Sequence, residues 1–165
     1  MFAVPTQAAA ATAAERHEAL LQQAQALFAG ERDRTANAAN LAALIYHSLP
    51  DLNWAGFYWH RNGELVLGPF QGKPACVRIA LGRGVCGTAA RERRTVLVPD
   101  VHRFPGHIAC DSASNSELVI PLVKAGELAG VLDLDSPLPG RFSEADARAL
   151  ERVAQAFLEA SDLAT

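Results

Sequence analysis

Apolar residues recur every three or four positions in two N-terminal segments, which is the spacing of an amphipathic helix. The first segment begins at Glu15 and ends at Gly30, a common helix stop. The second runs to Leu49, where Pro50 prevents a helix from continuing. The pattern therefore predicts two antiparallel helices that serve as scaffold.

The period of the pattern then changes from helical to two. The aromatic-rich run from Asn53 to His60 predicts a strand, and Asn62-Gly63 separates it from a second run over 64–70. An Asn-Gly step between two strand-like runs is a strong hairpin signal. The other strand-like segments are 75–79, 95–98 and the two runs on either side of Ala125-Gly126.

Two more helical segments complete the chain. A glycine-rich turn over 82–87 leads into a short helix, and Ser143 with Asp146 three residues later predicts the capped start of a last helix. We predict one α+β domain over residues 15–165, after a flexible lead-in over 1–14. Its sheet has about six mostly antiparallel strands, flanked by N- and C-terminal helices, because hairpins join the strands.

Composition narrows the function classes. The chain has 165 residues, half of them hydrophobic, and its 15 basic and 18 acidic residues leave a net charge of −3. Without a basic block, the sequence argues against nucleic acid or an anionic membrane as partner. No apolar run approaches the roughly 18 residues of a membrane span, and no signal peptide is evident. We expect a cytoplasmic protein.

Three cysteines, Cys76, Cys86 and Cys110, are an odd number for a structural disulfide framework and suit thiol chemistry. A metal site would draw on these thiols and on His102 and His107. Structural zinc sites normally use cysteine pairs close in sequence, which this chain lacks. We therefore expect no metal and no organic cofactor.

The segment Gly82–Gly87 matches the spelling G-x-G-x-x-G. A dinucleotide site also needs a βαβ unit, and the hairpin-paired strands argue against one. The glycines instead place Cys86 near a helix N-terminus, where the dipole favours a thiolate. The alternative is a buried cysteine acting as a small hydrophobic residue.

Three acids form the second candidate group. Asp133 and Asp135 are two residues apart on a strand, so they share a face, and a near-symmetric hairpin brings Glu117 alongside. Carboxyl groups crowded in a pocket raise each other's pKa, and a protonated acid can protonate an oxygen leaving sulfur. The alternative is that the two aspartates are simply exposed at a strand end.

The choice of attacking thiol stays open from the residues alone. Cys86 has the helix N-terminus in its favour. Cys110 lies in the long polar segment 99–116, which can close over a substrate and bring the sulfur to the acids.

Taken together, six segments closely resemble the free methionine-(R)-sulfoxide reductases, which are built on a GAF domain. They are Trp54-Ala-Gly-Phe-Tyr, Leu67-Gly-Pro-Phe-Gln-Gly-Lys-Pro-Ala-Cys76, Gly82-Arg-Gly-Val-Cys-Gly-Thr-Ala, Phe104-Pro-Gly-His-Ile-Ala-Cys110-Asp, Ser114-Asn-Ser-Glu117 and Gly130-Val-Leu-Asp133-Leu-Asp135-Ser. The resemblance covers nearly the whole chain after about residue 15.

The resemblance implies an oxidoreductase that reduces free L-methionine (R)-S-oxide to methionine through a cysteine sulfenic acid and a disulfide. A thioredoxin-type reductant then restores the dithiol. The resemblance favours Cys110 as the attacking thiol, Cys76 as the principal resolving thiol and Cys86 as an auxiliary one. The oligomeric state stays open, with a homodimer as one option.

Substrate binding is expected to use two aromatic residues and the acids. Trp54 and Tyr58 lie four apart on one strand face and can hold the substrate methyl group, although both also suit an ordinary core. Glu117, Asp133 and Asp135 are also candidates for binding the substrate ammonium. The alternative functions are a non-catalytic GAF sensor of a small ligand and a thiol redox sensor.

Overall fold

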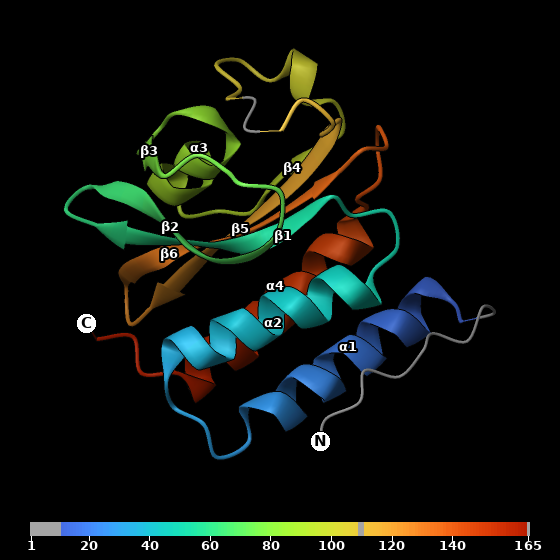
Figure 1. Ribbon diagram of the computed structural model, residues 1–165, viewed down its shortest axis with the longest axis vertical. Coiled ribbons are helices and arrows are strands. Elements are labelled where there is room, and N and C mark those ends of the chain that lie inside the picture. Colours follow the sequence, from blue (N-terminus) through green and yellow to red (C-terminus); the bar gives the residue numbers. More distant parts are fainter. Residues whose placement is uncertain (1–10, 109–110, 165) are drawn as a thin grey trace.

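A six-stranded sheet lies at the centre of the molecule (Figure 1). The computed structural model describes residues 11–108 and 111–164. The strands are β1 (Trp54–Arg61), β2 (Glu64–Gly72), β3 (Arg78–Ala80), β4 (Val96–Val98), β5 (Ser116–Lys124) and β6 (Glu127–Ser136). Their order is β3-β2-β1-β6-β5-β4, and every neighbouring pair is antiparallel. The predicted α+β class and six-stranded sheet are confirmed.

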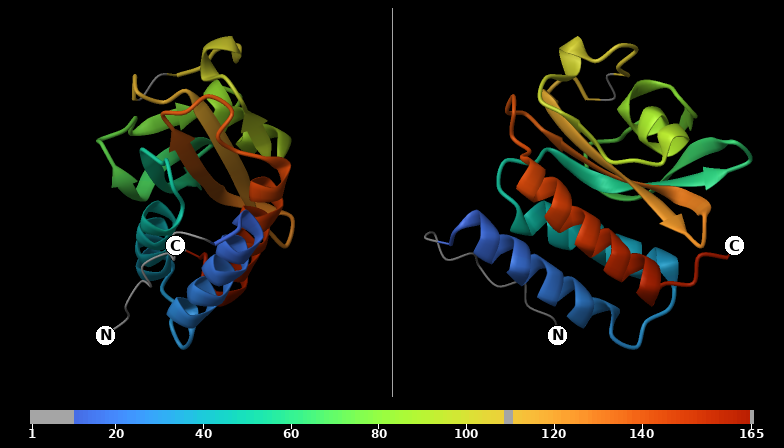
Figure 2. Two further views of the ribbon diagram at one scale, coloured as in Figure 1. Left: turned by 90° about the vertical axis from the view of Figure 1, so that its right-hand side faces the viewer. Right: turned by 180° about the vertical axis from the view of Figure 1, so that it is seen from behind.

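Helices cover both faces of this sheet unequally. Three long helices lie on one face, and a short helix lies on the other beside the longest loops (Figures 1 and 2). The long helices are α1 (Ala13–Phe28), α2 (Arg34–Ser48) and α4 (Glu144–Ala160), and the short ones are α3 (Gly84–Glu92) and the single 3-10 turn η1 (Val101–Arg103). α2 and α4 contact the sheet, and α1 packs on both of them.

Two predicted boundaries differ from the structure. α1 begins at Ala13 because Thr12 caps it, its Oγ1 accepting the Glu15 N–H at 3.2 Å while its own N–H donates to the Glu15 carboxylate at 2.7 Å. The rest of the predicted lead-in, residues 1–10, lies outside the described residues.

The second difference is β3, which is shorter than predicted and starts later, at Arg78. Its ladder with β2 ends at the Val66–Arg78 pair, followed by one bond from the Leu67 N–H to the Val77 carbonyl. The next donor position on that edge of β2 is Pro69, which has no N–H.

Alternation along β6 separates the two sides of the sheet. Leu132 and Leu134 are fully buried against the helices, in the same core as Phe157 of α4. Val131 and Asp133 point to the opposite side, toward α3. The helix-side core therefore stabilises the sheet, while the other face is left for chemistry.

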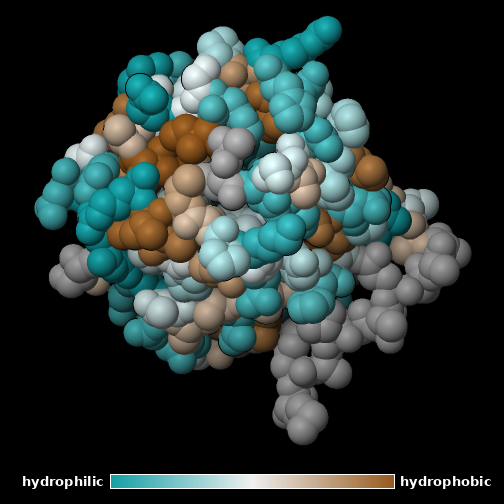
Figure 3. Space-filling model, turned by 45° about the horizontal axis from the view of Figure 1, so that its top comes forward, coloured by the Kyte–Doolittle hydropathy of each residue, from teal (hydrophilic) through white to brown (hydrophobic). Residues whose placement is uncertain are grey.

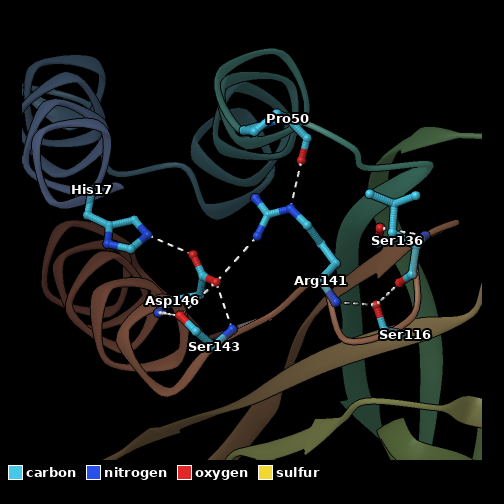
Figure 4. Close-up of polar contacts among 8 residues, drawn as sticks. His17, Pro50, Ser116, Ser136, Arg141, Ser143 and Asp146 are labelled. Atoms are coloured by element: carbon cyan, nitrogen blue, oxygen red, sulfur yellow. Dashed lines mark hydrogen bonds and ion pairs between the residues drawn. The ribbon is translucent and has the colours of Figure 1, made fainter. Parts of the chain in front are cut away.

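A polar cluster connects the helices to one another where α4 begins (Figure 4). Asp146 accepts from His17 of α1 at 2.8 Å, from the Ser143 N–H at 2.7 Å and from Arg141 at 3.3 Å. The Arg141 Nε also donates to the Pro50 carbonyl at 3.0 Å. The cluster therefore joins α1, α4 and the end of α2.

The same arginine contacts the start of β5, and Leu138 bonds both this start and the end of β6 (Figure 4). Its backbone N–H donates to the Ser116 Oγ at 3.3 Å, and that hydroxyl donates to the Leu138 carbonyl at 2.6 Å. The Ser136 Oγ accepts the Leu138 N–H at 3.0 Å. Ser116 directly precedes Glu117, and Ser136 directly follows Asp135. These bonds therefore hold the two strand ends that carry the acids.

Candidate active site

A cavity of about 530 Å³, counting its open mouth, lies on the sheet face opposite the three long helices. Its floor is formed by β1, β5 and β6. Its walls are formed by the start of α3, by 74–75, by 107–108 and by Asp111 and Ser114. Figure 3 turns this side of the molecule toward the viewer and shows patches of apolar surface among hydrophilic side chains.

The three predicted acids line this cavity together. Glu117 and Asp133 are 6% and 5% exposed, and Asp135 is partly buried, so the two aspartates are not simply exposed at a strand end. Glu117 lies directly opposite Asp135 across the β5–β6 ladder. Their side chains therefore leave the sheet on the same face.

A β-bulge sets this pairing. Val123 pairs with Leu128, whereas the next residue, Leu122, pairs with Gly130, so Ala129 is an extra residue in β6. The sequence had suggested a near-symmetric hairpin, and the structure instead shifts the register by one residue. Without the extra residue, Glu117 would face Leu134.

Burial raises the pKa of all three carboxyl groups well above their usual range. The nearby charge of Asp135 adds to this effect at Glu117, and the charge of Glu117 adds to it at Asp133. Each acid therefore favours its protonated form, as the sequence predicted for at least one of them. The Asp133 Oδ1 is buried without a hydrogen-bond partner among the described residues, so it is available to a ligand.

Cys86 adjoins the acids from the first turn of α3. Its side chain is 4% exposed, and its Sγ lies 3.8 Å from the Glu117 Oε1. Burial raises the pKa of the thiol well above its usual range, and the charges of Asp133 and Glu117 raise it further. The predicted thiolate at this helix N-terminus is therefore wrong, because burial and two acids outweigh the helix dipole.

The other two cysteines differ from Cys86 in what the structure describes of them. Cys76 is disulfide-bonded, whereas Cys86 is a free thiol. Cys110, the predicted attacking thiol, lies outside the described residues, so its role stays a prediction.

Both predicted aromatic residues line the cavity. Trp54 stacks on Tyr58 with ring centroids 5.8 Å apart, and on Phe70 at 5.3 Å. The Trp54 Nε1–H donates to the Lys73 carbonyl and the Tyr58 hydroxyl to the Cys76 carbonyl, both at 3.1 Å. Their polar ends are thus occupied within the protein, so the two side chains contribute apolar ring surface to the cavity lining.

Sequence reasoning missed polar residues around the mouth of the cavity. Asn53 donates to the Asp111 carboxylate at 3.1 Å and to the Ser114 hydroxyl at 3.0 Å. The backbone N–H of Ala113 lowers the pKa of Asp111. Asp111 directly follows Cys110, which was the available signal, but no local pattern connects it with Asn53.

The two histidines weighed as metal ligands do not come together in the described part of the chain. His107 lies 3.6 Å from the Glu117 Oε2 and burial lowers its pKa, while His102 bonds Asn115 at 2.9 Å and does not line the cavity. Donor atoms of Cys86, Glu117 and Asp133 do lie within 4.8 Å of one another. Among the described residues, these three could offer ligand atoms to a metal ion. Their raised pKa values favour protonated side chains instead.

Comparison with known proteins identifies the family. A GAF domain model matches residues 7–158. The free methionine-R-sulfoxide reductase of Escherichia coli is 56% identical over 128 residues, covering 78% of each chain. The chain belongs to the GAF-domain family of free methionine-(R)-sulfoxide reductases.

Solved structures of this family have the same fold. The reductase of Neisseria meningitidis, in complex with its substrate, has a TM-score of 0.89 at 43% identity, covering 94% of this chain and 93% of that one. The reduced form of fRMsr of Staphylococcus aureus has a TM-score of 0.87 at 44% identity, covering 94% and 99%. In the part of the chain that the structure describes, no helix is both long and apolar enough to cross a membrane.

Proposed function

We propose that this chain reduces free L-methionine (R)-S-oxide to L-methionine. The observation that carries the proposal is the group of Glu117, Asp133 and Asp135, which share a cavity with Trp54 and Tyr58. Family membership supports the substrate, because the related enzymes are named for free methionine-R-sulfoxide.

The proposed chemistry starts with the Cys110 thiolate attacking the sulfoxide sulfur. A protonated acid of the group delivers a proton to the sulfoxide oxygen, since the raised pKa keeps that proton available at neutral pH. Methionine leaves, and the oxygen stays on Cys110 as a sulfenic acid. The Cys76 thiol then attacks the sulfenic sulfur, forming the disulfide and releasing water. Cys86 is an auxiliary thiol.

The cycle closes outside the cavity. A thioredoxin-type dithiol supplies two electrons by thiol–disulfide exchange and regenerates both thiols. A cytoplasmic location fits this partner, because dithiols of this type are kept reduced in the cytoplasm. The chemistry requires no metal or organic cofactor.

Single-turnover reduction by the reduced protein, without added thiol and with a chelator present, tests the proposal. One methionine formed and two thiols lost per chain is the expected result. Cys110→Ser should form no methionine, while Cys76→Ser should form one methionine and accumulate the sulfenic acid. If the unmodified protein binds the sulfoxide but forms no methionine, the chain is a ligand sensor instead.

A further inference from the structure

The disulfide-bonded Cys76 lies in a short apolar segment at one edge of the sheet. This segment, 74–77, connects β2 to β3, and β3 is the last strand on that side (Figure 1). Pro74 and Val77 are exposed, while Ala75 and Cys76 are partly buried. A partner that reaches the Cys76 sulfur from solvent therefore meets apolar side chains around it. We call these four residues the 74–77 surface.

Val77 is the most exposed part of this surface. In the described part of the chain, Val77 at 63% and Leu138 at 45% are the exposed large hydrophobic residues. A single exposed apolar side chain is common on proteins, but Val77 directly follows a disulfide cysteine. The Val77 carbonyl accepts the Leu67 N–H at 2.9 Å, and the Cys76 carbonyl accepts the Tyr58 hydroxyl at 3.1 Å. These bonds hold the backbone that presents Val77 to solvent.

The charge along this edge is positive, although the whole chain has a net charge of −3. No acidic residue lies between Glu64 and Glu92 in the sequence, and the exposed Lys73 and Arg78 flank the 74–77 surface. Arg78 forms an ion pair with Glu64, whereas Lys73 is in no ion pair within the described chain. The surface therefore suits a partner that offers apolar contact area and acidic side chains.

We propose that the reducing protein docks on the 74–77 surface and that its thiolate attacks the Cys76 sulfur. This inference rests on the proposed function and adds the surface and the sulfur through which the cycle closes. The partner is a protein dithiol whose thiols are surrounded by apolar and acidic side chains. A small thiol needs only the sulfur, whereas the flanking apolar residues stabilise contact with a protein.

The exchange has two steps. The partner's thiolate forms a mixed disulfide with Cys76, and the other sulfur of the original bond leaves as a thiolate. The partner's second thiol then attacks its own sulfur in the mixed disulfide and releases Cys76. The partner's dithiol is thereby oxidised to a disulfide, its two electrons reduce the bond of Cys76, and its two protons pass to the released thiols.

The test follows reduction of the oxidised chain and requires no methionine sulfoxide. Second-order rate constants are measured with an acidic bacterial thioredoxin and with dithiothreitol, by quenching, alkylating and weighing the intact chain. The variants are Val77→Asn and the matched control Leu138→Asn, which changes the other exposed hydrophobic side chain. Both substitutions are neutral, so neither alters the charge beside the sulfur. Because both positions are exposed, the unfolding midpoint should stay unchanged.

Val77→Asn should slow reduction by thioredoxin about tenfold, the loss expected for one apolar contact of this size, and leave reduction by dithiothreitol unchanged. Leu138→Asn should change neither rate. The thioredoxin rate should also fall as the salt concentration rises, and a rate independent of salt would contradict the charge match. An unchanged thioredoxin rate in Val77→Asn would show that the inference is wrong, as would reduction by dithiothreitol alone.

A second measurement identifies the attacked sulfur. A thioredoxin whose second cysteine is replaced by serine cannot complete the exchange, so it should stay bound to Cys76 as a mixed disulfide. Peptide mass mapping locates the bond, and a bond to another cysteine would contradict the proposed attack. If thioredoxin reduces the chain as expected but the reduced chain forms no methionine from the sulfoxide, it is the proposed function that fails.

Discussion

The Cys86 sulfur lies 3.8 Å from the Glu117 Oε1, so this thiol adjoins an acid rather than a base. Contact with a carboxyl group opposes ionisation of the thiol, because both groups would carry negative charge in a buried place. Catalytic thiols are usually activated by a cation, a base or an open helix N-terminus. The geometry thus agrees with an auxiliary role for Cys86.

Slow alkylation of Cys86 is the first prediction. In the disulfide form, Cys86 is the free thiol and should react with iodoacetamide at pH 8 at least about tenfold more slowly than after unfolding in urea. Intact mass over time measures the reaction. Fast labelling of the folded protein would mean that the thiol is open and ionised.

Asp133→Asn should lower turnover and raise stability together. Loss of a general acid lowers kcat by about 10²- to 10⁴-fold. Removing one of several crowded buried acids should raise the unfolding midpoint by about 2–4 °C, which corresponds to about 1 kcal/mol in a chain of this size. Calorimetry and steady-state kinetics on the same sample check both effects, with the exposed Asp51→Asn as control.

The pH dependence of that stability gain has a definite sign. The native pKa values of the three acids are raised, whereas the unfolded chain loses these protons near pH 4. Above pH 4 the native state holds more protons, so its free energy of unfolding falls as pH rises. Asp133→Asn should therefore gain more over the unmodified protein at pH 8 than at pH 5. An equal gain at both values would contradict the raised pKa.

Trp54→Phe should weaken substrate binding. The smaller ring keeps the stack on Tyr58 but loses contact area and the bond to the Lys73 carbonyl. We expect KM to rise about 2- to 10-fold, the range of one sulfur–aromatic contact. Trp59→Phe is the matched control, because Trp59 lies on the opposite face of β1 and packs against the helices. An equal KM effect in both variants would point to general loosening of β1.

Asp146→Asn should destabilise the protein by about 1–3 kcal/mol, because the partly buried partners His17 and Arg141 lose a charged acceptor. Burial alone would raise the Asp146 pKa, but the Ser143 N–H, His17 and Arg141 hold it below its usual value of 3.8. Its contribution is therefore complete above pH 4 and is lost as pH falls through the lowered native pKa.

Denaturant titrations at pH 7 and pH 3 measure this contribution. The difference between Asp146→Asn and the unmodified protein should be smaller at pH 3. Glu18→Gln, which removes an exposed ion pair with Arg152, should change little at either pH. A constant difference across pH would show that the ion pairs of Asp146 are not what stabilises the start of α4.

Sequence patterns predicted the elements well where local chemistry decides them. The last helix begins after Ser143, as its capping residues predicted, and the Asn62-Gly63 step joins β1 to β2. The acids at 133 and 135 share a face because strand alternation is a local rule. The same rule predicted that Trp54 and Tyr58 of β1 share a face.

Other parts of the site depend on contacts that no local pattern encodes. The thiolate expected at Cys86 is disfavoured because the thiol is buried, and because acids from two strands distant in sequence adjoin it. Asn53 and Ser114 meet only after the sheet has formed, 61 positions apart in the chain.

The extra residue in β6 determines which side chains of this strand face the cavity and which face the helices. Deleting Ala129 would leave the helix-facing and cavity-facing residues out of step on the two sides of the hairpin. Either leucines would enter the cavity or the acids would enter the helix-side core. Changes in length should therefore be tolerated at the turn of Ala125 and Gly126 and rejected between the bulge and Asp135. Between the bulge and Asp135, this hairpin should tolerate substitutions better than insertions or deletions.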